Sequence, residues 1–455
     1  MATNGSDTIG DGSSGNEWLT LRYATSQMSG GDTLIIREGT YSGTNNVLWQ
    51  FALPPSGTSD NFTIIRAEHD GMAVFENGFI HMNNTATRSY ISFEGLKSLD
   101  YTMIYGSGIN HFKFLRCAFY YSNPEGTSAN ANLWIGLGCT YILAEDCYAW
   151  GAGRYRFVLG GSHHVLRRCV ARYDRGDWTD PMAQFSSYGA DDVAFQNCIA
   201  IDSDHPEFWV TENEKGGTFY IHHGSQNNIV DSCISVNDAN SWITGSPGHG
   251  LSIKNSLAID SGSYGLTMRG DSGVGDYLID KCTLLNITNY GLDPWYGSVN
   301  SVSARGCVLY GIASAAMHGT NLGGSDQGYN VLYNNNADFS GVSAVATDYC
   351  ADNGNAVDPI DGTPGNGISA ILYPVRIEAS SDLYDTGFGG DNRGATILKR
   401  VGISGTFWGE EGWNETTEEN LWPFPNEDRI KADMEEYIYT GPMVNGPIGT
   451  LYGNR

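Results

Sequence analysis

The fold is decided by a six-residue pattern, which reads Leu166-Arg167-Arg168-Cys169-Val170-Ala171 in one of its clearest copies. The next copy is Phe195-Gln196-Asn197-Cys198-Ile199-Ala200, with the polar pair, the cysteine and the apolar end in the same places. The aligned small residues of the eight copies are Cys117, Cys147, Cys169, Cys198, Cys233, Ser256, Cys282 and Cys307. Neighbours in this series are 22 to 35 residues apart. Such an irregular, strand-rich period predicts a β-solenoid.

Stacked coils explain why the aligned position is small. Each coil of a solenoid adds short strands to parallel sheets, so equivalent residues stack about 4.8 Å apart. Cysteine tolerates burial and is weakly polar, which suits an inward ladder at a tight corner. We expect the ladder to be reduced, because a disulfide needs a particular geometry. Metal binding by the ladder is not expected, because no two cysteines have C-x-x-C spacing.

A second strand precedes the cysteine in most coils. Examples are Leu133-Trp134-Ile135, Tyr155-Arg156-Phe157-Val158-Leu159 and Thr218-Phe219-Tyr220-Ile221-His222. With these coils the chain resembles the right-handed parallel β-helix proteins of the pectin-lyase-like superfamily. Its start, through Thr33-Leu34-Ile35-Ile36, is similar to the capping helix and first coil of secreted or viral β-helices. The resemblance covers roughly residues 5–350 and implies a fold more than a function, since the superfamily holds lyases, hydrolases, tailspikes and structural surface proteins.

The predicted fold class is therefore all-β, a right-handed parallel β-helix with an N-terminal capping helix and an irregular C-terminal tail. Residues 1–45 form the cap and first coil, with an amphipathic helix over residues 17–28 that covers the open end. Residues 46–350 form the β-helix. Residues 351–455 lose the repeat and are expected to pack on the solenoid, with a short helix at 427–437.

Composition and charge exclude several classes of protein. The 455 residues include 59 glycines and 12% aromatic but only 17% charged residues, which argues against a disordered chain or a coiled coil. With 25 basic and 51 acidic residues the net charge is −26, so we expect neither a nucleic-acid partner nor insertion into a membrane. The first residues do not read as a secretory signal. We expect an extracellular protein, secreted or on a virion surface.

Strand alternation predicts a binding face. If Phe157, Ile221 and Leu266 point to the core, their neighbours point outward. The outward residues are then Arg156, Tyr220, His222, Thr267 and Arg269. Two long loops, 174–182 and 202–216, lie beside the same strands. We expect a groove along this sheet.

Basic residues gather close to this face. Six of the 25 lie between positions 154 and 175, namely Arg154, Arg156, Arg167, Arg168, Arg172 and Arg175. A positive cluster in so acidic a chain suits the carboxylates or sulfates of an acidic polysaccharide. The expected substrate-binding residues are Arg172, Arg175, Tyr220, Trp209 and Trp295. In the alternative, the arginines form ion pairs on adjacent coils with Asp177, Asp180, Asp191 and Glu145.

The favoured catalytic interpretation is β-elimination on a uronic acid polymer. It needs a cation or donor at the carboxylate and a base near C5. The candidates to neutralise the carboxylate are Arg156, Arg175 and Arg269, and the candidate bases are Lys215 and His222. Glu212 and Glu214 are the candidate ligands for Ca²⁺, which prefers oxygen. This arrangement resembles what β-helix lyases acting on chondroitin or alginate use.

Two other classes of function stay open. Asp191-Asp192 and Gly248-His249-Gly250 are similar to motifs of β-helix polygalacturonases, which hydrolyse with paired carboxylates, but the Asn-x-Asp and Arg-x-Lys motifs of that family are missing. A protein without catalysis would bind sugar rings through exposed aromatic residues. It would otherwise be a structural subunit of an extracellular filament or phage particle, which predicts a homo-oligomer.

Overall fold

The protein is described by a computed structural model that covers most of the chain. The described residues are 1–49, 52–82, 87–121, 131–173, 183–202, 217–238, 241–245, 250–269, 276–296, 301–319, 328–348, 350, 374–377, 379, 381 and 383–436. They belong to two compact units. Unit 1 comprises residues 1–179, 402–414 and 424–455, and unit 2 comprises residues 180–401 and 415–423.

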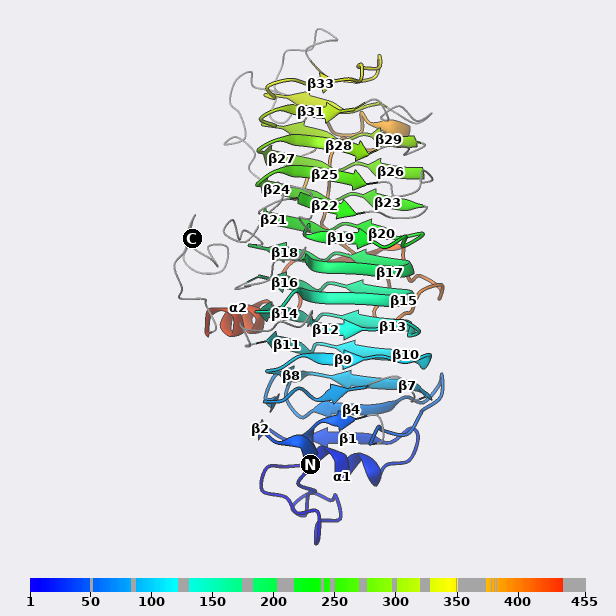
Figure 1. Ribbon diagram of the computed structural model, residues 1–455, viewed down its shortest axis with the longest axis vertical. Helices are drawn as coiled ribbons and strands as arrows, with labels where there is room; N and C mark the ends of the chain where they lie inside the picture. Colours follow the sequence, from blue (N-terminus) through cyan, green and yellow to red (C-terminus); the bar gives the residue numbers. More distant parts are fainter. Residues whose placement is uncertain are drawn as a thin grey trace. The chain divides into compact units, whose positions relative to one another are not determined.

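Unit 1 is built from three columns of parallel strands, which the chain visits in turn (Figure 1). The first column contains β3 (Leu48–Trp49), β6 (Ile80–His81), β9 (Thr102–Ile104), β12 (Ala131–Ile135) and the first half of β15 (Tyr155–Arg167). The second contains β1 (Thr33–Ile36), β4 (Thr63–Ala67), β7 (Thr87–Glu94), β10 (Gly108–Leu115), β13 (Thr140–Glu145) and the second half of β15. The third contains β2 (Gly39–Tyr41), β5 (Ala73–Phe75), β8 (Leu96–Ser98), β11 (Ala118–Tyr121), β14 (Tyr148–Gly151) and β16 (Val170–Arg172).

Unit 2 repeats the three columns. The first contains the start of β17 (Ala183–Gln196), β19 (Phe219–His222), β22 (Ser241–Gly245), β25 (Tyr264–Arg269), β28 (Tyr290–Tyr296), β31 (Ala315–His318) and β33 (Phe339–Ser340). The second contains the end of β17, β20 (Ile229–Asp231), β23 (Leu251–Lys254), β26 (Asp276–Asp280) and β29 (Ser301–Arg305). The third contains β18 (Ile199–Ile201), β21 (Ile234–Asp238), β24 (Leu257–Ser261), β27 (Thr283–Ile287), β30 (Val308–Tyr310) and β32 (Val331–Tyr333). The elements outside the columns are the 3-10 turns η1 (Thr44–Asn46) of unit 1 and η5 (Phe388–Gly390) of unit 2, and an antiparallel pair in unit 2, β34 (Lys399–Val401) and β35 (Thr416–Asn420).

The corner between the second and third columns explains the repeated pattern. The residue before each aligned small residue has a left-handed backbone, with φ between 48° and 60° from Arg116 to Gly306. The following thiol then donates to a carbonyl of the preceding turn, as Cys117 does to Phe93 O at 3.4 Å and Cys233 to Phe195 O at 3.3 Å. A small, buried, weak donor is therefore what this corner requires. All nine cysteines are buried and none is in a disulfide.

The predicted fold class is confirmed, and the N-terminal helix is shorter than predicted. Helix α1 (Leu21–Ser26) follows Thr20, whose side chain accepts a hydrogen bond from Tyr23 N. The residues before it are held out of the helix by Asp7, whose carboxylate accepts the amide hydrogens of Leu19 and Thr20 at 2.9 and 3.1 Å.

Late segments of the chain pack on unit 1. Phe407 lies against Phe62 and His111. His111 belongs to an outward ring ladder, in which Tyr90, His111, Tyr141 and His163 stack at 4.7 Å spacings. Helix α2 (Glu427–Glu436) lies beside the third column (Figure 1), where Asp433 accepts a hydrogen bond from Lys97 at 2.8 Å. The predicted helix at 427–437 is thus present.

Candidate functional site

One register column of outward positions runs through the first column of unit 2. Strand pairing places Ser186 beside Tyr220, Tyr220 beside Thr244, Thr244 beside Thr267 and Thr267 beside Asp293. Their neighbours in sequence, such as Phe185, Phe219 and Leu266, are buried in the core. The outward alternation that the sequence predicts is therefore present in unit 2, and among its described side chains Tyr220 is half-buried whereas Ser186, Thr267 and Asp293 are buried.

A compact cluster of rings occupies one end of this face. The rings of Tyr220 and His222 stack with centroids 3.8 Å apart, and Tyr188 stacks on His223 at 4.1 Å. His222 Nε2 lies 3.0 Å from Ser186 Oγ, and its Nδ1 lies 2.8 Å from Nδ1 of His223. His222 is 1% exposed, whereas His223 is exposed and Tyr220 half-buried. The cluster offers aromatic faces for sugar rings and a chain of groups that can pass a proton from His222 to the surface.

The sequence predicted Tyr220 and His222 on the same face, and in the structure their rings stack. Their partners in the cluster were not predicted. Ser186, Tyr188 and His223 reach the cluster through strand register and through the left-handed backbone of His223, whose φ is 58°. The alternation of β17 could have identified Ser186 and Tyr188, because they flank the inward Ser187.

The predicted outward position of Arg156 is wrong. It is completely buried, and its guanidinium donates to the carbonyl oxygens of Gly151, Ala152 and Gly153 at 2.5–2.6 Å. Alternation gives the side from which a side chain leaves the strand, but a long side chain can turn back over the adjacent corner. Arg156 holds the turn between β14 and β15 together.

Arg172 is likewise not on the predicted face. It lies in the third column of unit 1, is 1% exposed, and donates to Met434 O of α2 at 2.9 Å. The helix that covers it is more than 250 residues away in sequence, so the local pattern contained no sign of this cover.

The basic cluster is partly neutralised within unit 1. Arg167 lies 2.9 Å from Glu145, and Arg168 lies 2.9 Å from Glu145 and 2.6 Å from Asp146. Arg167 also donates to the carbonyl oxygens of Ile403 and Trp413 at 2.9 and 2.8 Å. For these two arginines, the alternative of ion pairs with Glu145 holds.

Several predicted site residues lie outside the described residues, so the structure neither places nor joins them. These are Arg175, Trp209, Glu212, Glu214 and Lys215, together with the side chains of Arg269 and Trp295. Among the side chains that are described, no group of three or more His, Cys, Asp or Glu residues is arranged to hold a metal ion.

The hydrolase motifs do not form an acid pair in the described structure. Asp191 accepts a hydrogen bond from Gln226 N at 3.0 Å, and Asp192, with φ of 57°, accepts one from Asn227 at 3.3 Å. Both therefore serve a turn between the first and second columns. Gly248 and His249 lie outside the described residues.

A second part of the face carries a histidine that the sequence did not indicate. Asp293 on β28 accepts a hydrogen bond from Nδ1 of His318 on β31 at 2.9 Å, and the ring of Tyr290 stacks on His318 at 4.1 Å. Burial raises the pKa of Asp293, while its contact with His318 acts in the opposite direction. The two residues are 25 positions apart and meet only through strand pairing.

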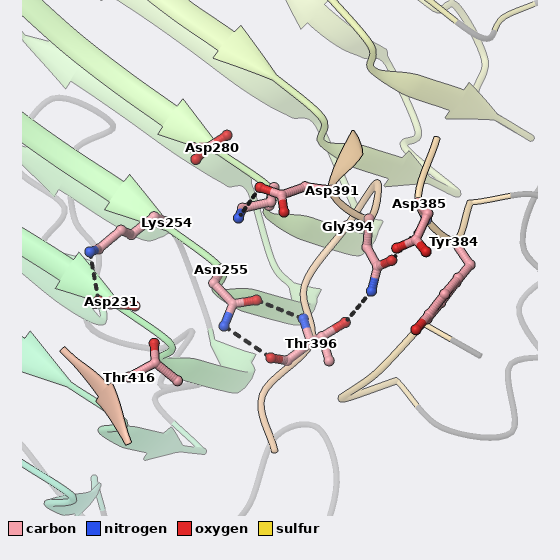
Figure 2. A pocket seen from close by; sticks show the side chains of 12 residues that line it. Asp231, Lys254, Asn255, Asp280, Tyr384, Asp385, Asp391, Gly394, Thr396 and Thr416 are labelled. Atoms are coloured by element: carbon pink, nitrogen blue, oxygen red, sulfur yellow. Dashed lines mark hydrogen bonds and ion pairs between the residues drawn. The ribbon is translucent and has the colours of Figure 1, made fainter. Parts of the chain in front are cut away.

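Unit 2 also contains a polar pocket of about 380 Å³, beside β20, β23 and β26 (Figure 2). Its walls hold two ion pairs, Lys254 with Asp231 at 3.0 Å and Lys281 with Asp391 at 2.8 Å. Burial raises the pKa of Asp231, against the effect of Lys254. Figure 2 shows the amide of Asn255 facing the backbone of Thr396 across the floor of the pocket. Because these charges are used in pairs, the pocket joins a corner of the β-helix to the returning chain. The ring cluster around Tyr220 and His222 is therefore the better candidate site.

Comparison with known proteins identifies the architecture. No protein-family model and no curated protein matches the sequence. The pectate lyase Pel9A has a similar structure, with a TM-score of 0.50 and 16% identity over 87% of this chain and 94% of that one. This chain has the parallel β-helix fold. A rhamnogalacturonan lyase and the A-module of the Azotobacter vinelandii mannuronan C-5 epimerase AlgE6 are also similar, with TM-scores of 0.38 and 0.40 at 16% and 11% identity. They cover 75% and 71% of this chain, and each match covers 88% of the other chain.

Identities this low show the β-helix fold alone, so function has to be argued from the site. Among the described helices of this β-helix, none is both long and apolar enough to cross a membrane.

Proposed function

We propose that this β-helix protein binds an acidic polysaccharide along the first column of unit 2 and cleaves it by β-elimination. The observation that carries the proposal is the stacked pair Tyr220 and His222 on the outward face, with Ser186 and His223 bonded to the histidine ring. The likeness to a pectate lyase supports the choice of substrate class. We also propose an extracellular or virion-surface location, because such polymers lie outside cells.

Each group has a role that follows from its position. The half-buried ring of Tyr220 is a surface on which a sugar ring can stack, and exposed His223 is placed to contact its hydroxyl groups. The candidate proton acceptors from the sequence are His222, which the cluster holds in place, and Lys215. The backbone of Arg269 continues the same face on β25, and we propose that its guanidinium neutralises the substrate carboxylate.

Five further predicted site residues come from three stretches of the chain: Arg175 before β17, Trp209, Glu212 and Glu214 before β19, and Trp295 within β28. We propose that Trp209, Arg175 and Trp295 contact the polymer, and that Glu212 and Glu214 hold Ca²⁺ as the cofactor. When bound there, the ion would supply positive charge for the uronate carboxylate.

The test is a product assay. The purified protein is incubated with a panel of acidic polysaccharides, with and without Ca²⁺, and the ultraviolet absorbance of unsaturated uronate is followed. We expect a rising signal, and a fall of about 10²–10⁴-fold in Lys215→Ala or in His222→Gln would identify that residue as the base. His69→Gln is the matched control, because His69 is an exposed histidine in unit 1, paired with Glu38.

The alternatives predict different results. Release of reducing ends without unsaturated product would support a hydrolase. No product on any polymer, together with ordered assemblies in electron micrographs, would support a structural subunit and would contradict the lyase proposal.

A further inference from the structure

The pair Asp293 and His318 has the geometry of an oriented base. A carboxylate can only accept, so Nδ1 of His318 carries the hydrogen in the 2.9 Å bond to Asp293. A neutral ring with a hydrogen on Nδ1 has a lone pair on Nε2. Among the described residues, none makes a hydrogen bond to Nε2 of His318. The stacked ring of Tyr290 fixes the plane of the imidazole.

Asp293 is buried and His318 is partly exposed, as an oriented base and its positioning carboxylate should be. The side chain of Asp293 is 3% exposed, whereas that of His318 is 31% exposed. The carboxylate is therefore screened from water and the imidazole is reachable by a large substrate.

His222 lacks this freedom. Its two ring nitrogens face Ser186 and His223, and the ring is 1% exposed. Of the two histidines, His318 is the better placed to touch a substrate directly.

We propose that His318, positioned by Asp293, is the proton acceptor of a polysaccharide-cleaving site on the outward face of unit 2. The inference rests on the proposed function and names the base for it. Tyr220 and Asp293 belong to one register column, and the pairing of Leu292 with Met317 puts His318 next in that column. From β19 to β31 there are four strand spacings, or about 19 Å. A polymer lying along the stack would contact Tyr220 with one sugar and His318 with another several units away.

The chemical step balances within the substrate and the ring. Nε2 of His318 takes the proton from C5 of a uronate, and the electrons of that C–H bond form the C4=C5 double bond. The C4–O bond breaks, its electrons leave with the glycosidic oxygen, and that oxygen takes a proton from water. The imidazolium returns its proton to solvent, so no oxidant or reductant is involved.

The experiment combines turnover with a direct view of the ring. On the polymer that the panel identifies, His318→Gln should lower kcat by about 10²–10⁴-fold, and Asp293→Asn should lower kcat while KM stays the same. Long-range proton–nitrogen NMR spectra of the labelled full chain, assigned by the loss of one signal in His318→Gln, should show the neutral His318 ring with its hydrogen on Nδ1. Asp293→Asn should change that tautomer balance and lower kcat together, whereas a merely structural role would leave kcat unchanged.

The results separate the two proposals. If the wild-type protein is active and His318→Gln has the same activity, the assignment of His318 as the base is overturned and the lyase proposal stands. A His318 ring with its hydrogen on Nε2 overturns the assignment whatever the activity. An inactive wild-type protein overturns the lyase proposal, and the base assignment with it. His69→Gln controls for loss of a histidine, and equal melting temperatures control for folding.

Discussion

The side-chain amide of Asn255 pairs with the peptide of Thr396, 141 residues further along the chain. Its Nδ2 donates to Thr396 O at 3.0 Å, and its Oδ1 accepts from Thr396 N at 2.6 Å. Asn197 meets the chain in the same way, through Lys399 O at 3.2 Å and Val401 N at 2.6 Å. Both asparagines stand at left-handed corners of unit 2, so the corner that turns the chain also presents an amide edge to the returning segment.

Loss of this pairing should destabilise unit 2. Asn255→Ala removes these two hydrogen bonds and a third to Ser232 Oγ at 2.9 Å, and it puts alanine at a φ of 48°. We expect a loss of about 2–4 kcal/mol in the free energy of unfolding. Asn334→Ala is the matched control, because exposed Asn334 has a φ of 55° and stands at a left-handed corner too. Urea midpoints of the two variants measure the difference. Equal losses would show that the backbone conformation, and not the pairing, matters.

The buried guanidinium of Arg167 should matter more than exposed ion pairs. It is 0% exposed and bonded to Glu145 and to two carbonyl oxygens of the late segment, so Arg167→Ala should cost about 3–5 kcal/mol. Arg37→Ala, which breaks a pair with a 42% exposed arginine, should have a much smaller effect. Denaturant unfolding of both variants tests this. Similar losses would contradict it.

His164 should make unit 1 sensitive to acid. It is buried, accepts from Ile142 N and contacts Gly160 O, and burial lowers its pKa to about 4. Between pH 6.5 and 4 the unfolded chain binds the extra proton and the native chain does not. The contribution of neutral His164 to the free energy of unfolding is therefore fully present above pH 6.5. It is lost as the pH falls towards 4, by up to about 3 kcal/mol.

The pH effect is measured as a difference between proteins. Unfolding free energies of wild type and His164→Gln are compared from pH 7 to pH 4, so that contributions common to both cancel. The advantage of the wild type should shrink as the pH falls. Parallel curves would rule the effect out.

The cysteine thiols should be unreactive in the native protein. All nine cysteines are buried, and burial raises the pKa of Cys117, Cys147 and Cys282 well above the usual value and that of Cys139 to about 12. A disulfide reagent at neutral pH should titrate no thiol before unfolding and nine in guanidinium. Fewer than nine after unfolding would reveal disulfides.

The sequence predicted the fold best where successive coils require the same residue types at the same corner. The left-handed residue and the small residue after it recur at every corner, so Asn197-Cys198 and Lys281-Cys282 could be aligned without any structure. The outward position of Tyr220 also followed from alternation. Contacts between distant segments could not be predicted: Arg172 is covered by α2, and His318 finds Asp293 only through register. One sequence shows the periodicity of the coils, but it does not show which distant segments pack against them.

The contact between Arg167 and Ile403 has a consequence for how the protein is made. The two residues are 236 positions apart, so at about 5–20 residues per second Ile403 is synthesised roughly 10–50 s after Arg167. During that interval the ring ladder of Tyr90, His111 and Tyr141 waits without Phe407. In a nascent chain, the strands synthesised first therefore expose a surface that the late segment has not yet covered. Chaperones could bind this exposed surface. A premature stop codon late in the gene would damage the region that was translated first.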